Sequence, residues 1–89
     1  MTEFEHLNSV LGSEFDRYVV EHPAFASRIP LGAEVVLQLR GHARFNAWAR
    51  GLLRRNHEEG RPVLLVTIHR LRPRRSRIVL PRLRRLTAA

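Results

Sequence analysis

Residues 34–68 read EVVLQLRGHARFNAWARGLLRRNHEEGRPVLLVTI, and this stretch decides the fold. It begins and ends with apolar runs, at 34–39 and 62–68, whose near-continuous aliphatic content is typical of covered, parallel strands. Between them, residues 43–58 carry apolar side chains on one helical arc and arginines on the opposite arc. Strand, helix and strand joined by short loops predict a βαβ unit with two parallel strands.

An amphipathic helix is predicted upstream, over residues 3–21, because apolar side chains recur there at helical spacing. Gly12 weakens its middle, so a shorter helix capped by Ser13 is the alternative. Pro23 ends the helix, and the residues after it would form a short helical turn that brings Phe25 into the core. This first helix would cover the sheet beside the second one.

Two strands alone make a marginal sheet, so a third strand is expected. Residues Ser76–Leu80 can supply it, by pairing within this chain or with a sister subunit. The expected architecture is therefore a small single-domain α/β fold. Its compact core would span residues 1–70, and residues 71–89 would form a basic, extended C-terminal tail docked on protein.

The length of 89 residues indicates a single domain. The absence of cysteine excludes disulfides and thiolate metal sites. The amino terminus carries acids and lacks a long apolar run, so neither a signal peptide nor a membrane span is expected. We expect a cytoplasmic protein. The five histidines have no metal-ligand spacing, and no motif calls for a cofactor.

Charge is distributed unevenly along the chain. Residues 1–34 contain six acids and two arginines, a net charge of −4. Residues 35–89 contain two acids and fourteen arginines, a net charge of +12. This asymmetry indicates that one end of the molecule binds an anionic partner.

The basic charge is densest in residues 69–86, HRLRPRRSRIVLPRLRRL, which hold eight arginines, six aliphatic residues, no acid and no aromatic residue. The aliphatic residues favour docking on protein with the arginines facing outward; a solvated, charged surface is the alternative. The candidate partner-binding residues are Arg70, Arg72, Arg74, Arg75, Arg77, Arg82, Arg84 and Arg85. A second set on the outer face of the 43–58 helix, which would extend them, is Arg44, Arg50, Arg54 and Arg55.

Three functions compete. The first is a non-catalytic interaction module that forms a homo-oligomer or docks on a larger acidic protein partner through the tail. The second is an accessory protein that binds nucleic acid without sequence specificity, with the tail arginines on phosphates. The third is a small hydrolase or nuclease that uses His42, His57 or His69. No catalytic residue is assigned, because no acid or histidine pair has the spacing of a known catalytic motif.

Several short motifs occur in order along the chain: Glu14–Tyr18 (EFDRY), His22-Pro23, Ile29-Pro30, a strand beginning at Ala33, Glu59–Val63 (EGRPV), Leu71–Pro73 and Ser76-Arg77. Together they resemble a family of short prokaryotic proteins of unknown function, over about residues 14–78. The resemblance implies a shared small α/β fold and transfers no catalytic residues. Members of that family have fewer arginines in this latter part, so the resemblance does not account for the basic tail.

Overall fold

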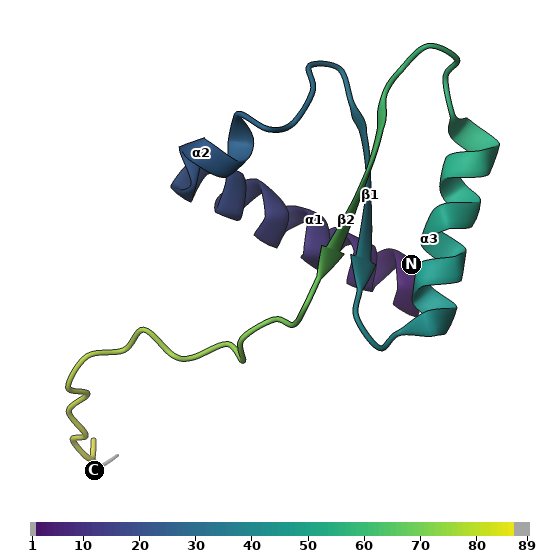
Figure 1. Cartoon of the computed structure of the whole chain (residues 1–89). Coiled ribbons are helices and arrows are strands. Elements are labelled where there is room, and N and C mark those ends of the chain that lie inside the picture. The colour runs from purple at the N-terminus through teal and green to yellow at the C-terminus, as the bar shows by residue number, and fades with distance from the viewer. Residues whose placement is uncertain (1, 87–89) are drawn as a thin grey trace.

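The computed structural model describes residues 2–86, which form an N-terminal helix followed by a βαβ unit (Figure 1). The elements in chain order are α1 (Glu3–Glu21), α2 (Pro23–Ala26), β1 (Glu34–Leu39), α3 (Ala43–Asn56) and β2 (Val63–Ile68). The small α/β fold predicted from the sequence, with its helix and two parallel strands, is confirmed. The second strand starts one residue later, and the second helix ends two residues earlier, than the sequence pattern suggested.

α1 is a single helix that continues through Gly12. Thr2 caps its amino terminus, and the side-chain oxygen of Thr2 accepts a hydrogen bond from the backbone N–H of Glu5. This cap satisfies one of the free N–H groups of the first turn. Leu11 is fully buried beneath the sheet and holds the middle of the helix in place. The alternative of a shorter helix capped by Ser13 is wrong, because burial of the Leu11 face outweighs the low helix propensity of one glycine.

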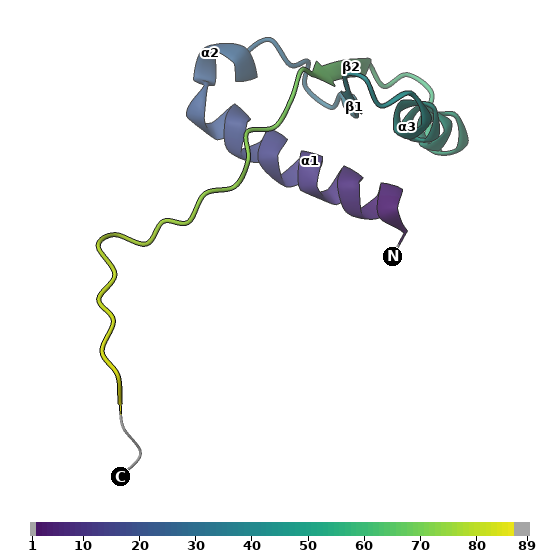
Figure 2. The same cartoon turned by 90° about the horizontal axis from the view of Figure 1, so that it is seen from below.

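The two strands form a parallel sheet in a single register that pairs Glu34 with Val63 and Leu39 with Ile68. α1 crosses one face of this sheet, while α3 lies along the side of β1 (Figures 1 and 2). The core lies where these elements meet. Its buried apolar residues are Leu11, Val36, Leu37, Phe45 and Ala49.

Aromatic side chains form two groups at opposite ends of α1. Phe4, in the first turn, lies edge-on to the fully buried Phe45 of α3, with the ring centroids 5.8 Å apart. At the other end, Phe25 of α2 packs edge-on against Phe15 and Tyr18 of α1, at 6.3 and 5.2 Å. Phe25 therefore joins a satellite group beside the sheet, whereas the sequence pattern predicted that it would lie in the main core.

The chain leaves the folded body after β2. Residues 69–86 contain no helix or strand, and Figures 1 and 2 show them running away from the sheet. The longest dimension is consequently 69 Å and the radius of gyration is 18.9 Å, against about 12 Å for a compact domain of this length. Among residues 2–86, no helix has the length and apolar character needed to cross a bilayer.

Candidate functional site

The eight tail arginines are all exposed along the extended segment. Within residues 2–86, the ion pairs that form lie elsewhere, and none joins a tail arginine to a carboxylate. These guanidinium groups therefore keep their full hydrogen-bonding capacity, and each presents a planar fork suited to carboxylate or phosphate.

The first residues of the tail run beside α1. Leu71 is only 37% exposed. Together with Arg72 and Arg74 it borders a hollow of about 580 Å³ whose opposite wall includes Val10 and Glu14. The start of the tail thus lies near an acidic helix. Farther along, the tail departs from the body (Figure 2).

Within residues 2–86, the aliphatic residues farther along the tail are left largely uncovered. Ile78, Val79 and Leu80 are 72%, 81% and 88% exposed, and Leu83 and Leu86 are at least 80% exposed. The predicted pairing of Ser76–Leu80 as a third strand within this chain is therefore wrong for the structure as described, which has a two-stranded sheet. The chain instead passes α1 after β2 and leaves the folded body (Figure 2).

The arginines of α3 do not extend the tail's basic surface. Arg44, Arg50, Arg54 and Arg55 are exposed on α3, as their helical phase predicts. But α3 lies beside β1, and the tail leaves from β2 on the other side of the sheet (Figures 1 and 2). In the last turn of α3, Arg54 and Arg55 also have a structural role, because positive charge there complements the helix dipole.

A groove of about 440 Å³ lies between α1, α2 and β2. Its apolar lining comes from both layers and consists of Phe15, Tyr18, Phe25, Val66, Ile68 and Leu71. Tyr18 remains 46% exposed, so these aromatic side chains are only partly covered. The whole of α1 is about 28 Å long at 1.5 Å per residue. The two-stranded sheet is too narrow to cover the carboxyl-terminal half of this helix.

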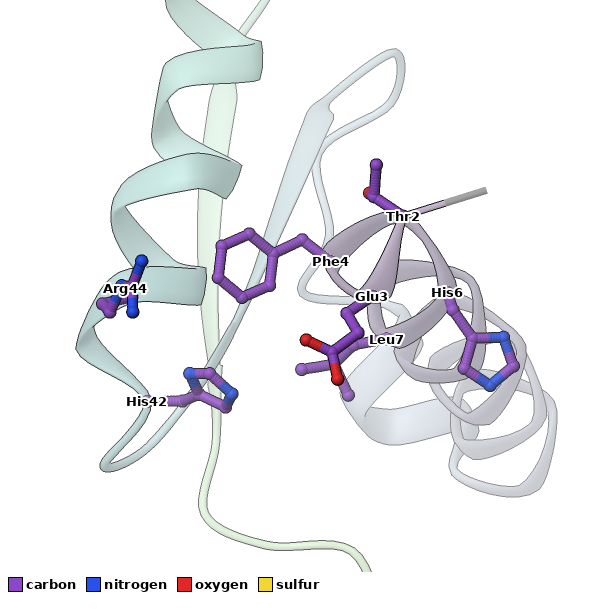
Figure 3. A pocket seen from close by; sticks show the side chains of 7 residues that line it. All are labelled: Thr2, Glu3, Phe4, His6, Leu7, His42 and Arg44. Atoms are coloured by element: carbon purple, nitrogen blue, oxygen red, sulfur yellow. The ribbon is translucent and has the colours of Figure 1, made fainter.

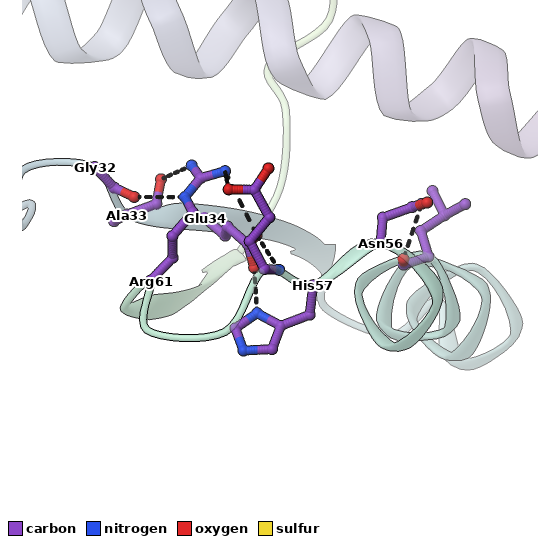
Figure 4. Close-up of polar contacts among 8 residues, drawn as sticks. Gly32, Ala33, Glu34, Asn56, His57 and Arg61 are labelled. Carbon is purple, nitrogen blue, oxygen red and sulfur yellow. Dashed lines mark hydrogen bonds and ion pairs between the residues drawn. The ribbon is translucent and has the colours of Figure 1, made fainter.

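A polar cluster that sequence reasoning missed lies at the amino end of β1 (Figure 4). His57 Nδ1 donates to Glu34 Oε2 at 2.5 Å, and the N–H of Glu58 donates to Glu34 Oε1 at 3.0 Å. Arg61 Nη1 lies 3.5 Å from the same carboxylate and its Nε donates to the Gly32 carbonyl at 2.9 Å. The sequence could have predicted this cluster, because parallel pairing of the two strands brings the loop before β2 back to the start of β1.

The hydrogen bond from His57 is the main cause that holds the pKa of the Glu34 carboxyl below its ordinary value, with the Glu58 N–H and Arg61 adding to it. The carboxylate thus stays charged and fastens the α3–β2 loop to β1. This cluster stands at the amino end of the strands, whereas open α/β sheets place ligands at the carboxyl end.

The histidines considered for hydrolysis do not meet at one site. His57 lies beside Glu34 at the amino end of the strands. His42 and His69 follow the carboxyl ends of β1 and β2, and His69 Nδ1 accepts from Arg40 Nη1 at 2.9 Å. Within residues 2–86, no group of three potential ligands is placed to hold a metal ion.

A wide hollow separates the first turn of α1 from the start of α3 (Figure 3). Phe4 and Leu7 supply its apolar floor, and Glu3 and His42 face its opening. His6 points away on the far side of α1, so the polar groups do not converge on a common point (Figure 3). A converging set of polar groups is what positions a small ligand.

Comparison with known proteins gives a family and no function. Neither a curated protein nor a solved structure matches this chain. A family model described as "Family of unknown function (DUF5647)" matches residues 3–81. The match includes α1, the βαβ unit and the tail up to Pro81, and so contains the Ser76–Leu80 run. The chain therefore belongs to this family of unknown function.

Proposed function

We propose that the protein is a non-catalytic assembly module that associates through its tail, with another copy of itself or with an acidic protein partner. The observation that carries the proposal is the row of exposed aliphatic residues on the extended segment. Burying a Leu, Ile or Val side chain contributes about 1.5–3 kcal/mol.

The charge of the tail complements the aliphatic residues. Arginines that alternate with them can face solvent or an acidic surface while the apolar side chains are buried. The cysteine-free composition suits a reducing cytoplasm, which is the compartment that this proposal assumes.

Deletion of residues 70–89 tests the proposal. The full-length chain is expected to sediment as an oligomer or to co-purify with an acidic protein, and the deleted chain as an uncomplexed monomer. Sedimentation velocity of untagged protein at several concentrations measures the difference. An unchanged assembly state after deletion would contradict the proposal.

A second candidate is non-specific binding of nucleic acid, which the eight exposed tail arginines favour. If all eight contact phosphates of duplex DNA, the logarithm of the association constant should fall with the logarithm of salt concentration with a slope of about −7. The tail lacks aromatic residues, so stacking on unpaired bases would contribute nothing there.

Filter binding at two salt concentrations measures this slope. The triple substitution of Arg82, Arg84 and Arg85 by Gln should weaken binding and flatten the slope. The matched control replaces Arg50, Arg54 and Arg55 of α3 by Gln, with the same loss of charge on the other side of the molecule. Equal effects of the two sets of substitutions would contradict binding of nucleic acid through the tail. Absence of any binding at low salt would contradict a nucleic-acid-binding function altogether.

A further inference from the structure

The two outer edges of the sheet are covered differently. Along β1, α3 lies against the edge, and the Asn46 side chain reaches the backbone of Leu39. Its Oδ1 accepts from the Leu39 N–H and its Nδ2 donates to the Leu39 carbonyl, each at 2.9 Å. A side-chain amide thus replaces a neighbouring strand at this point. Among the helices and strands of residues 2–86, β1 is the element whose backbone runs close to that of β2.

Hydrogen bonds fix which groups of β2 remain unpaired. The N–H of Glu34 bonds the carbonyl of Pro62, and the N–H of Arg40 bonds that of Ile68. In a parallel ladder the direction alternates, so the even-numbered residues of β2 face β1. The backbone groups of Val63, Leu65 and Thr67 therefore face outward. Unpaired backbone groups on an edge strand are prone to pair with another chain.

The tail contains a segment that matches this edge in length and chemistry. Pro73 and Pro81 bracket seven residues, Arg74–Leu80, each of which has a backbone N–H, and β2 has six residues. The segment holds the tail's two β-branched aliphatic residues, Ile78 and Val79. Leu80 has a φ of 45°, which leucine rarely adopts and which a strand conformation would relieve.

We propose that the outer edge of β2 and the adjacent groove are the acceptor site for residues Arg74–Leu80 of a second copy of this chain, which adds to the sheet as a third strand. Side chains alternate between the faces of a strand. Ile78 and Leu80 enter the groove beside Phe25 and Val66, because the opposite phase would bury two arginines. Arg75 and Arg77 then lie on the open face of the sheet.

Charge selects a second copy as the donor. α1 carries five acids and one arginine, and Glu14 stands in the wall of the groove. A segment with three arginines and no acid complements that helix. The chain's own segment is carried away from the edge, so the donor comes from another molecule. Each copy has one donor and one acceptor, and reciprocal exchange closes a two-fold dimer.

This inference rests on the proposed assembly function and adds the acceptor site to it. Two single substitutions in the full-length chain test it, Ile78→Asp and Val79→Asp. Both place one negative charge at a tail position whose natural residue is at least 72% exposed, so neither should unfold the body. Ile78→Asp places a charge in the groove and should weaken dimerisation by about tenfold or more. Val79→Asp places the charge outside the groove and should change the dissociation constant of the dimer by less than about threefold.

Sedimentation equilibrium measures both dissociation constants, and hydrogen exchange reports on the edge itself. In the dimer the amides of Leu65 and Thr67 should exchange slowly, and dilution should make them exchange fast. A full-length chain that is monomeric at every concentration, with or without nucleic acid on the tail, overturns both self-association and this site. Tail-dependent dimers in which the two substitutions act equally, or the Thr67 amide stays fast, overturn the acceptor site alone.

Discussion

β1 and β2 have the same length and share one ladder, yet their surroundings differ. Val36, Leu37 and Gln38 of β1 are buried in succession, so this strand is covered on both faces. Along β2 burial alternates, and Val63 and Leu65 are 45% and 50% exposed. Both strands are apolar in sequence, so composition did not separate them. The difference arises because α3 packs against β1 and not against β2. Asn46 also covers the β1 edge, while β2 keeps a free edge.

The largest expected effect comes from proline in β2. Val66→Pro removes an N–H that faces β1 and should lower the free energy of unfolding by about 3 kcal/mol or more. Thr67→Pro removes an N–H that faces outward and should cost about 1 kcal/mol in the monomer, while weakening the dimer. Urea denaturation at low concentration measures stability, and sedimentation measures assembly. The controls Val66→Ala and Thr67→Ala keep the N–H groups, and equal losses from the two prolines would contradict the assigned strand phase.

A smaller effect is expected from the amide that covers the β1 edge. Asn46→Ala leaves the Leu39 N–H without its partner, while the Leu39 carbonyl keeps the bond from the His42 N–H, and should cost about 2 kcal/mol of the free energy of unfolding. The control is Asn56→Ala, which loses one exposed bond to the Leu52 carbonyl and should cost less than about 0.5 kcal/mol. Thermal or urea unfolding compares the two. Similar losses would mean that Asn46 does not protect the strand edge.

The smallest effect should come from the cluster at the start of β1. The pKa of Glu34 is lower in the folded chain than its ordinary value, chiefly because of the hydrogen bond from His57. Its contribution to stability is therefore complete above the unfolded pKa of about 4.3 and is lost as the pH falls through the lower folded pKa. Glu34→Gln should reduce the urea midpoint at pH 7, and the difference from the natural chain should shrink in acid.

Glu59→Gln is the control for this measurement, because Glu59 is exposed in the same loop and makes none of the Glu34 contacts. It should leave the urea midpoint close to that of the natural chain at both pH values. A Glu34→Gln effect that stayed constant from pH 7 into acid would show that the carboxylate charge does not fasten the loop.

The secondary structure followed from local pattern in most of the body. The apolar arc of 43–58 and the two aliphatic runs gave the βαβ unit, and Pro23 gave the break after α1. Residues that act across long sequence distances were not foreseen. Asn46 and the Glu34–His57 pair are polar residues of ordinary appearance, and only the parallel return of the chain gives them partners.

The tail divides in the same way. Its composition indicated exposed arginines, and they are exposed. Composition also suggested a strand at Ser76–Leu80, which the structure does not form within the chain. A strand needs a partner edge at the right distance, and no local pattern in the strand itself supplies that information.

By itself the sequence determined the α/β class, the order of the elements and the separation of an acidic helix from an arginine-rich tail, because helical and strand periodicity and charge are local properties. Tertiary structure decided that α3 covers β1, that β2 retains an open edge above an apolar groove, and that the tail leaves the body. These depend on which surfaces meet when the chain folds, and burial and hydrogen-bond pairing are settled only by that contact.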